Sequence, residues 1–175
     1  MGIPREIKQG DLKALKEYIF YNPLTGIFFW VKKPSPLSNK CKDSLAGCYD
    51  FSNGYWKIAF RKRTYTAHRL AWFFVNGLSD QNKFIDHIDC NKLNNSISNL
   101  RLVNATENAY NSKKQSNNTS GVKGVTFIKR TKRWGCRLSI NGVNKSLASF
   151  ELLSDAKDFI EKAREKFHKE FCNHG

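Results

Sequence analysis

The sequence has no long apolar run. Its longest aromatic and aliphatic stretch, residues 70–75, is far shorter than the roughly 20 residues that a helix needs to cross a bilayer. The first residues, MGIPREIKQ, contain no apolar core of the kind found in secretory signals. We therefore expect a soluble protein of the cytoplasm that has no membrane partner.

Cysteine is sparse, and its spacing forms no recognised metal or disulfide pattern. The chain has five cysteines, an odd number, and no two of them are arranged as Cys-x-x-Cys. An odd number argues against a secreted disulfide scaffold, and structural zinc sites usually take closely spaced pairs. We expect reduced thiols and no structural zinc.

Acidic residues are missing from two long stretches of a strongly basic chain. Its 175 residues include 30 Lys and Arg but 15 Asp and Glu, which gives a formal net charge of +15. No acidic residue occurs between Glu107 and Glu151 or within residues 51–79. One such stretch could be an ordinary solvated face, but two favour a polyanionic partner, most commonly nucleic acid.

The predicted order mixes helices with groups of short strands, which indicates an α+β fold. Apolar residues at helical spacing indicate helices, and short aromatic or β-branched runs between turn residues indicate strands. We predict helices over 11–20, 67–76 and from Ser154 to about 170, and strands over 27–32, 55–60, 64–66, 122–129, 133–140 and 145–150. Asn104 and Glu107 have capping-box spacing and predict a further helix start. Asn141-Gly142 predicts a tight hairpin turn.

The stretch 84–111, FIDHIDCNKLNNSISNLRLVNATENAYN, concentrates residue types that serve catalysis. A strand ending at Asp86-His87 is predicted to lead through an Asn-rich loop to a second strand over 99–103, and then to a helix. If that helix packs across the two strands, Asp86 and Asn108 converge on one point. His87 projects from the opposite side of the strand to Asp86, because side chains alternate.

These side chains suit the hydrolysis of a phosphodiester bond with one divalent cation. The Asp86 carboxylate and the Asn108 amide oxygen are hard ligands of the kind that Mg²⁺ takes, with Mn²⁺ as the alternative. A neutral His87, whose ordinary pKa is about 6.5, can accept a proton from the attacking water near neutral pH. Asn99 could hold either the loop backbone or the His87 ring in position.

Residues 65–112 resemble the HNH nucleases, the ββα-metal group that includes free-standing and intron-encoded homing endonucleases of phages. In that pattern an Asn follows the Asp-His pair 12 residues after the His, and the third motif residue follows nine further on, as in Asp86-His87, Asn99 and Asn108. The resemblance implies Asp86 and Asn108 as metal ligands, His87 as general base and Asn99 as the residue that orients it. It includes the upstream HRLAW, where we expect His68 to be structural or to contact phosphate.

Residues 120–170 resemble the AP2-type DNA-binding domain, in which a three-stranded sheet lies in the major groove. The resemblance rests on Gly121-Val-Lys-Gly-Val125, on Lys132-Arg-Trp134 and on the helix from Ser154. Trp134 could equally pack beneath that helix as a core residue. Together with the basic stretches, the resemblance implies these DNA-contacting residues: Arg61, Arg63, Arg69, Lys123, Arg130, Arg133, Trp134, Arg137 and Lys145.

These observations predict a nuclease domain over 1–111, a polar linker over 112–120 and an AP2-like DNA-binding domain over 121–175. The fold class is α+β, with a ββα-metal motif in the first domain and a small three-stranded sheet with one helix in the second. The favoured function is a site-specific double-stranded DNA endonuclease, in effect a homing enzyme, acting as a monomer in a host cytoplasm if the gene is phage-encoded. The alternatives are a non-catalytic DNA-binding regulator and, less favoured, an RNA-binding protein.

Overall fold

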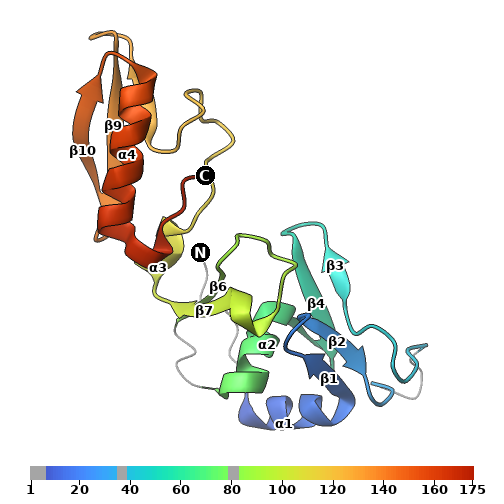
Figure 1. Ribbon diagram of the computed structural model, residues 1–175. Helices are drawn as coiled ribbons and strands as arrows, with labels where there is room; N and C mark the ends of the chain where they lie inside the picture. The colour runs from blue at the N-terminus through green and yellow to red at the C-terminus, as the bar shows by residue number, and fades with distance from the viewer. Residues whose placement is uncertain (1–6, 35–38, 79–82) are drawn as a thin grey trace. The chain divides into compact units, whose positions relative to one another are not determined.

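The computed structural model describes residues 7–34, 39–78 and 83–175 (Figure 1). Its mixture of small antiparallel sheets and helices confirms the predicted α+β fold. Contacts within the chain divide it into two compact units, Met1–Val103 and Asn104–Gly175. No helix in the described part of the chain is long and apolar enough to cross a membrane.

The first unit begins with helix α1 (Gln9–Tyr18), which continues directly into strand β1 (Ile19–Asn22). β1 pairs in antiparallel fashion with β2 (Ile27–Trp30). The prediction of a helix over 11–20 is therefore wrong at both ends. The β-branched and aromatic run that starts after α1 pairs with the equally aromatic β2, and this pairing overrides the helical spacing.

A three-stranded antiparallel sheet and a helix complete the centre of this unit. The sheet has the order β3-β4-β5, formed by β3 (Cys48–Asp50), β4 (Tyr55–Phe60) and β5 (Arg63–Thr66). Helix α2 (Ala67–Asn76) follows at once and contacts β4 and β5. The predicted bounds of β4 and α2 are confirmed, whereas β3 is an additional strand.

The hairpin that carries the Asp-His pair closes the first unit. It consists of β6 (Phe84–His87) and β7 (Leu100–Val103), joined by a loop that ends in a 3-10 turn, η1 (Ile97–Asn99). Asn99 therefore ends this turn and does not open the second strand as predicted. The hairpin lies beside α2, which contacts both β6 and η1.

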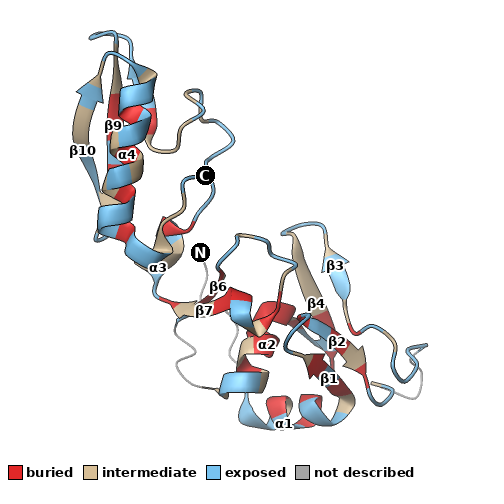
Figure 2. Cartoon of the chain, in the orientation of Figure 1, coloured by how far each residue is buried: buried red, intermediate tan, exposed pale blue. Residues whose placement is uncertain are grey.

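A single hydrophobic core holds these elements of the first unit together. Figure 2 shows the buried residues on α1, α2 and the strands around them. Residues that are 1% exposed or less in this core are Leu15, Ile19, Phe28, Ala46, Ile58, Ala67, Leu70, Ala71 and Phe73. Because the hairpin adds Ile85 and Leu100 to the same core, the position of the Asp86-His87 pair is fixed by packing.

The second unit is a three-stranded sheet covered by one long helix. In chain order it contains α3 (Ala105–Tyr110), β8 (Val125–Ile128), β9 (Arg133–Ile140), β10 (Val143–Phe150), α4 (Leu153–His168) and the 3-10 turn η2 (Lys169–Phe171). The antiparallel order is β10-β9-β8, and α4 packs on it over a core that includes Cys136 and Ile160. The predicted strand over 133–140 and the Asn141-Gly142 turn are confirmed.

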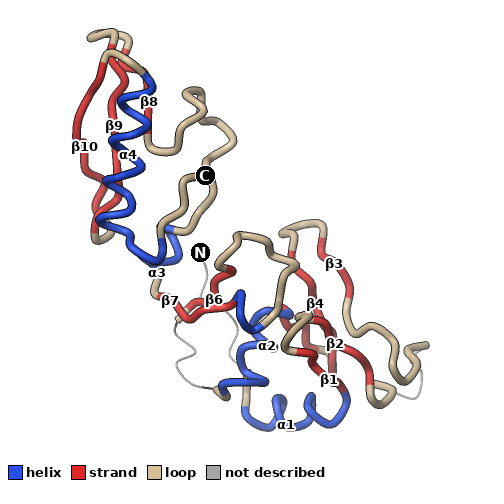
Figure 3. Tube along the Cα trace, viewed as in Figure 1, coloured by secondary structure: helices blue, strands red, loops and turns tan. Residues whose placement is uncertain are grey.

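Residues 112–120 lie in the loop between α3 and β8 (Figure 3) and belong to the second unit. The Ser120 hydroxyl donates to the carbonyl of Val125 at 2.7 Å, and the Asn118 amide donates to the carbonyl of Val122 at 3.0 Å. The Lys114 ammonium donates to the carbonyl of Gly121 at 2.9 Å. These bonds tie the loop to residues 121–125. The boundary between the two compact units lies at Val103 and Asn104, and the predicted domain limits at 111 and 121 stay a prediction.

Candidate active site and nucleic-acid interface

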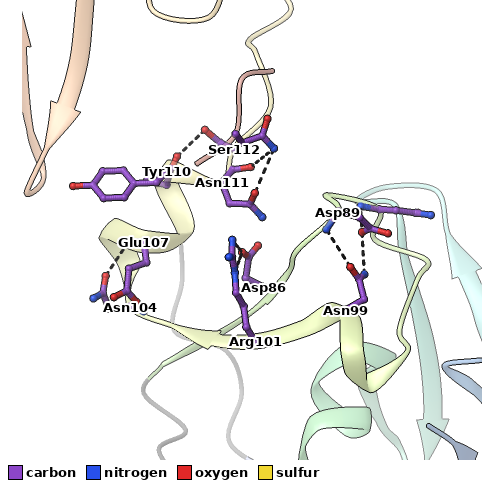
Figure 4. Close-up of polar contacts among 12 residues, drawn as sticks. Asp86, Asp89, Asn99, Arg101, Asn104, Glu107, Tyr110, Asn111 and Ser112 are labelled. Carbon is purple, nitrogen blue, oxygen red and sulfur yellow. Dashed lines mark hydrogen bonds and ion pairs between the residues drawn. The ribbon is translucent and has the colours of Figure 1, made fainter. Parts of the chain in front are cut away.

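The register of β6 and β7 places Asp86 directly opposite Arg101. Nε and Nη2 of Arg101 both donate to Oδ2 of Asp86 at 3.0 Å (Figure 4). The Arg101 and Asp86 side chains are 17% and 12% exposed, so solvent screens this pair less than it would a pair on the surface. The pair fixes the direction of the Asp86 carboxylate. Arg101 was not expected from the sequence, since only the strand register brings the two residues together.

His87 lies on the same strand as Asp86 and is buried, with 5% of its surface exposed. Its Nε2 lies 3.1 Å from Oδ1 of Asn95, and Nδ2 of Asn95 in turn donates to the carbonyl of Leu93 at 3.2 Å. The second bond orients the amide so that its oxygen faces the imidazole. Nε2 of His87 must then carry the proton, which places the ring's lone pair on Nδ1.

The surroundings of His87 favour its neutral form. Burial lowers the pKa of His87 below its ordinary value of 6.5, although the hydrogen bond with Asn95 opposes the shift. The His68 ring lies 5.0 Å away, edge to face, and the Tyr55 ring lies 4.9 Å from that of His68. Burial also lowers the pKa of His68 well below 6.5, so two neutral imidazoles lie side by side.

Asn99 fixes the loop that follows His87. Its Oδ1 accepts from the backbone N–H of Asp89 at 3.1 Å, while its Nδ2 donates to Oδ1 of Asp89 and to the carbonyl of Asn94 (Figure 4). Burial alone would raise the pKa of Asp89, but hydrogen bonds from Asn94, Asn91 and Asn99 outweigh it and lower that pKa. Of the two possibilities for Asn99, these contacts are those of a residue that holds the loop backbone.

Asn108 lies on α3, whose start is fixed by the predicted capping box. The Asn104 side chain accepts from the N–H of Glu107, and the Glu107 carboxylate accepts from the N–H of Asn104 (Figure 4). Asp86 belongs to the first unit and half-buried Asn108 to the second. The convergence of these two residues on one metal ion therefore stays a prediction.

The donor set fits a hard cation better than a soft one. Mg²⁺ keeps several waters and is commonly held by one or two protein oxygens together with a substrate phosphate, as one carboxylate and one amide allow. Zinc instead takes clustered His and Cys side chains, and no group of three or more His, Cys, Asp or Glu in the described residues could hold a metal ion. Of the two expected ligands, Asp86 is the anionic one, and Arg101 orients its carboxylate.

The expected DNA-contacting residues fall into an exposed group and a group engaged within the protein. The exposed residues are Arg61, Arg63, Arg130, Arg137 and Lys145, of which Arg63 pairs with Asp11 at 2.9 Å. Arg137 alternates along β9 with Cys136 and Leu138, which face the core under α4. It therefore lies on the opposite, open face of the sheet, where DNA could reach it.

The other expected residues make contacts within the protein, and only the packing of Trp134 had been considered from the sequence. Arg69 is 7% exposed, and burial lowers its pKa. The Lys123 ammonium donates to the carbonyls of Tyr110, Ser112 and Asn173. Arg133 donates to the Glu151 carboxylate at 3.1 Å and to the carbonyl of Ser149 at 3.0 Å. Trp134 packs against the core of the second unit and against the Phe127 ring. A DNA-contacting role for these four residues stays a prediction.

Comparison with known proteins places the hairpin and its flanking helices in a known class. The family model for HNH endonucleases matches residues 65–110, which run from β5 to the end of α3. Protein 3.8 of Escherichia phage T7 is 35% identical over 105 residues, which cover 60% of this chain and 86% of that protein. The chain belongs to the HNH endonuclease family.

A second relative carries the family in its name. The uncharacterized HNH endonuclease L560 of Acanthamoeba polyphaga mimivirus is 29% identical over 106 residues, or 60% of this chain and 54% of that protein. No solved structure matches the chain significantly. The AP2-like interpretation of residues 121–175 remains a prediction.

Proposed function

We propose that the protein is a site-specific endonuclease of the homing type that hydrolyses double-stranded DNA with one divalent ion, Mg²⁺ or Mn²⁺. The observation that carries the proposal is a buried, neutral His87, oriented by Asn95, on the same strand as an Asp86 carboxylate oriented by Arg101. A general base and an anionic metal ligand on adjacent residues are what single-metal phosphodiester hydrolysis needs.

In the proposed reaction each side chain has a separate task. Asp86 and Asn108 would hold the metal ion, which supplies charge neutralisation at the scissile phosphate and the departing oxygen. His87 would accept a proton at Nδ1 from the attacking water, while its Nε2–H stays bonded to Asn95. Asn99 would keep the loop after His87 in place through Asp89. Its family role of orienting His87 would then be indirect.

For DNA binding we propose the two basic stretches, led by the exposed Arg61, Arg130, Arg137 and Lys145. We retain the proposed organisation of a nuclease domain over 1–111, a connection over 112–120 and an AP2-like domain over 121–175. The first would cut and the last would supply affinity and site choice. We further propose that the protein acts as a monomer, because one site per chain suffices for nicking. We also propose that it acts in the cytoplasm, which is that of a host cell if the gene is phage-encoded.

The proposal is tested by cleavage of supercoiled plasmid carrying source-genome fragments, with Mg²⁺ or EDTA. We expect metal-dependent relaxed or linear product from the wild type, and a rate lower by at least about 10²-fold for His87→Ala with DNA binding nearly unchanged. Lys162→Gln, which changes an exposed side chain of α4 outside the site, serves as the control.

Two outcomes would contradict this proposal. Cleavage that survives His87→Ala would show that His87 is not the base. No product from the wild type, together with a tight gel shift on the same DNA, would favour the non-catalytic regulator. Asn108→Ala tests the metal separately, because loss of a ligand should lower the rate and raise the Mg²⁺ concentration needed for half-maximal cleavage.

A further inference from the structure

The second unit contains a cavity of about 540 Å³ that has no role of its own above, although Lys123 and Arg137 of its lining are among the expected DNA-contacting residues. It lies between the end of α3, the loop 112–120, the start of β8 and one end of α4. Its cationic and imidazole lining consists of Lys113, Lys114, Lys123, Arg137, Arg164 and His168. No Asp or Glu is among its lining residues, all of which the structure describes. The lining itself is therefore positively charged, and Glu161 outside it interacts electrostatically with Arg164.

Part of this charge is held in place by backbone atoms and not by carboxylates. Arg164 is 1% exposed; its Nη2 donates to the carbonyl of Lys123 at 2.7 Å and its Nη1 lies 3.0 Å from Nδ1 of His174. Within the described residues it forms no ion pair, and its Nε has no hydrogen-bond partner. Lys114 and Lys123 likewise donate to carbonyls. Glu161 interacts with Arg164 electrostatically but forms no ion pair with it, and a buried guanidinium without such a pair is costly, which favours an anion from outside.

One other cation of the lining remains available to a ligand. Lys113 is exposed, and within the described residues its side chain makes no hydrogen bond or ion pair. Beside it the wall carries neutral donors and acceptors such as Gln115, Asn117 and Thr126. Cations for a phosphate and amides or hydroxyls for a sugar or base edge are the features of a nucleotide site.

We propose that this cavity binds a nucleotide phosphate. The volume lies within the range of small-ligand pockets, roughly 300–1,000 Å³, and so admits one nucleotide unit. The phosphate could belong to a DNA strand or to a free nucleotide, and the strand is favoured because Lys113 and Arg137 lie in the long acid-free stretch. For that source the inference rests on the proposed DNA-directed function, but it does not require cleavage.

The first arm of the test measures binding of a labelled DNA duplex in EDTA, where cleavage plays no part. Lys113→Gln should lower affinity roughly three- to tenfold and reduce the salt slope by about one, as expected for one lost phosphate contact. Lys162→Gln, which removes an exposed lysine of α4 outside the cavity, is the matched control and should change neither value. Equal effects of the two variants would overturn the proposal.

The second arm locates the ligand by backbone amide NMR shifts. Titration with thymidine monophosphate and, separately, with the duplex should shift the amides of cavity residues such as Lys113, Thr126 and Ser139. Shifts with the duplex alone would identify the ligand as a phosphate of a DNA strand. Shifts with both probes would show that the cavity also binds free nucleotides. If neither ligand shifts them, the cavity is not a phosphate site, even if the wild type cuts plasmid. Conversely, if these amides shift but the wild type does not cut plasmid, the phosphate site in the cavity is supported and the proposed endonuclease activity is contradicted.

Discussion

At the scale of single residues, the contact between His87 and Asn95 decides which nitrogen can act as a base. The amide oxygen of Asn95 is an acceptor only, so it stabilises the Nε2–H tautomer without adding charge. A neutral partner also leaves the effect of burial dominant, and burial lowers the pKa of His87. The unprotonated, basic form then persists below the ordinary value of 6.5, so the wild type should keep its cleavage rate in mildly acidic buffer.

Replacing that amide with a carboxylate should reverse this behaviour. In Asn95→Asp, a negative charge beside Nε2 stabilises the imidazolium and should raise the pKa of His87 by roughly one or two pH units. Because only the neutral ring accepts a proton, the acidic limb of the single-turnover rate should move to higher pH by the same amount. Asn91→Asp makes the same change on an exposed residue of the same loop and should leave the limb in place. If the acidic limb of the rate stays at the same pH in Asn95→Asp, His87 is not the residue that accepts the proton.

Gly26 lies against the backbone of the loop that carries Asn95. Its φ is +73°, and a Cβ built on it would lie 2.3 Å from the carbonyl carbon of Asn95 and from the nitrogen of Ser96. Gly26→Ala should therefore lower the free energy of unfolding by about 3 kcal/mol, from backbone strain and displacement of the loop. Gly10→Ala, in α1 with nothing within 4 Å, should instead be neutral or stabilising by up to about 1 kcal/mol. Urea unfolding measures both, and equal values would refute the close approach.

These residues also mark what could be predicted from the sequence. The capping box of Asn104 and Glu107 involves neighbours three residues apart, so its spacing alone predicts the bond, and the bond is confirmed. Asn95 and Arg101 depend on the loop path and the strand register, which no local pattern contains. Asn95 stood among several asparagines typical of turns, and its contact with His87 appears only in three dimensions.

At the scale of elements, two hairpins have turns of two residues each but differ in the residue types that form the turn. The β9–β10 turn is Asn141-Gly142, the pair that a turn with two positive φ angles favours. The β4–β5 turn has the same backbone pattern, with φ of 48° and 61°, but is formed by Arg61 and Lys62. Two long cations in the left-handed region are costly, and such strain is often kept where a residue serves binding.

Exchanging stability for binding at this turn is testable. Arg61→Asn with Lys62→Gly should raise the free energy of unfolding by about 1 kcal/mol, because the new pair fits the turn. The same variant should weaken DNA binding severalfold, since two exposed cations of the proposed interface are lost. Arg61→Gln with Lys62→Gln is the control, because it removes the charges without relieving the backbone. If both double variants bind DNA like the wild type, the turn lies outside the interface.

Element prediction succeeded where apolar spacing and packing agree. The bounds of α2 and β9 are confirmed because their apolar residues face one core at the period of the element. β1 was missed because its residues continue the helical spacing of α1, and pairing with β2 decided the outcome. The bonds of the loop 112–120 run from polar side chains to carbonyls, so they leave no periodic signal in the sequence.

At the scale of the whole molecule, the distribution of charge matters more than its sum. Of the cations in the acid-free stretches, Arg69 is buried and Lys123 and Arg133 are engaged within the protein, whereas others such as Lys62, Lys113 and Arg130 are exposed. The net charge of +15 thus overstates the cations that can meet phosphate. Composition predicts a polyanionic partner, but only the fold separates binding cations from structural ones.

Salt dependence measures that difference directly. With about eight phosphate contacts, log K for a DNA duplex in EDTA should fall with log salt at a slope near −7, because each contact releases counterions. A slope several units shallower would show that the exposed cations of the acid-free stretches do not form the footprint. Measuring Arg130→Gln and Lys145→Gln alongside the Lys162→Gln control sharpens the result. Each of the first two variants should make the slope less steep by about one, and the control should leave it unchanged. That result would show that binding depends on where a charge lies and not on how many charges the chain carries.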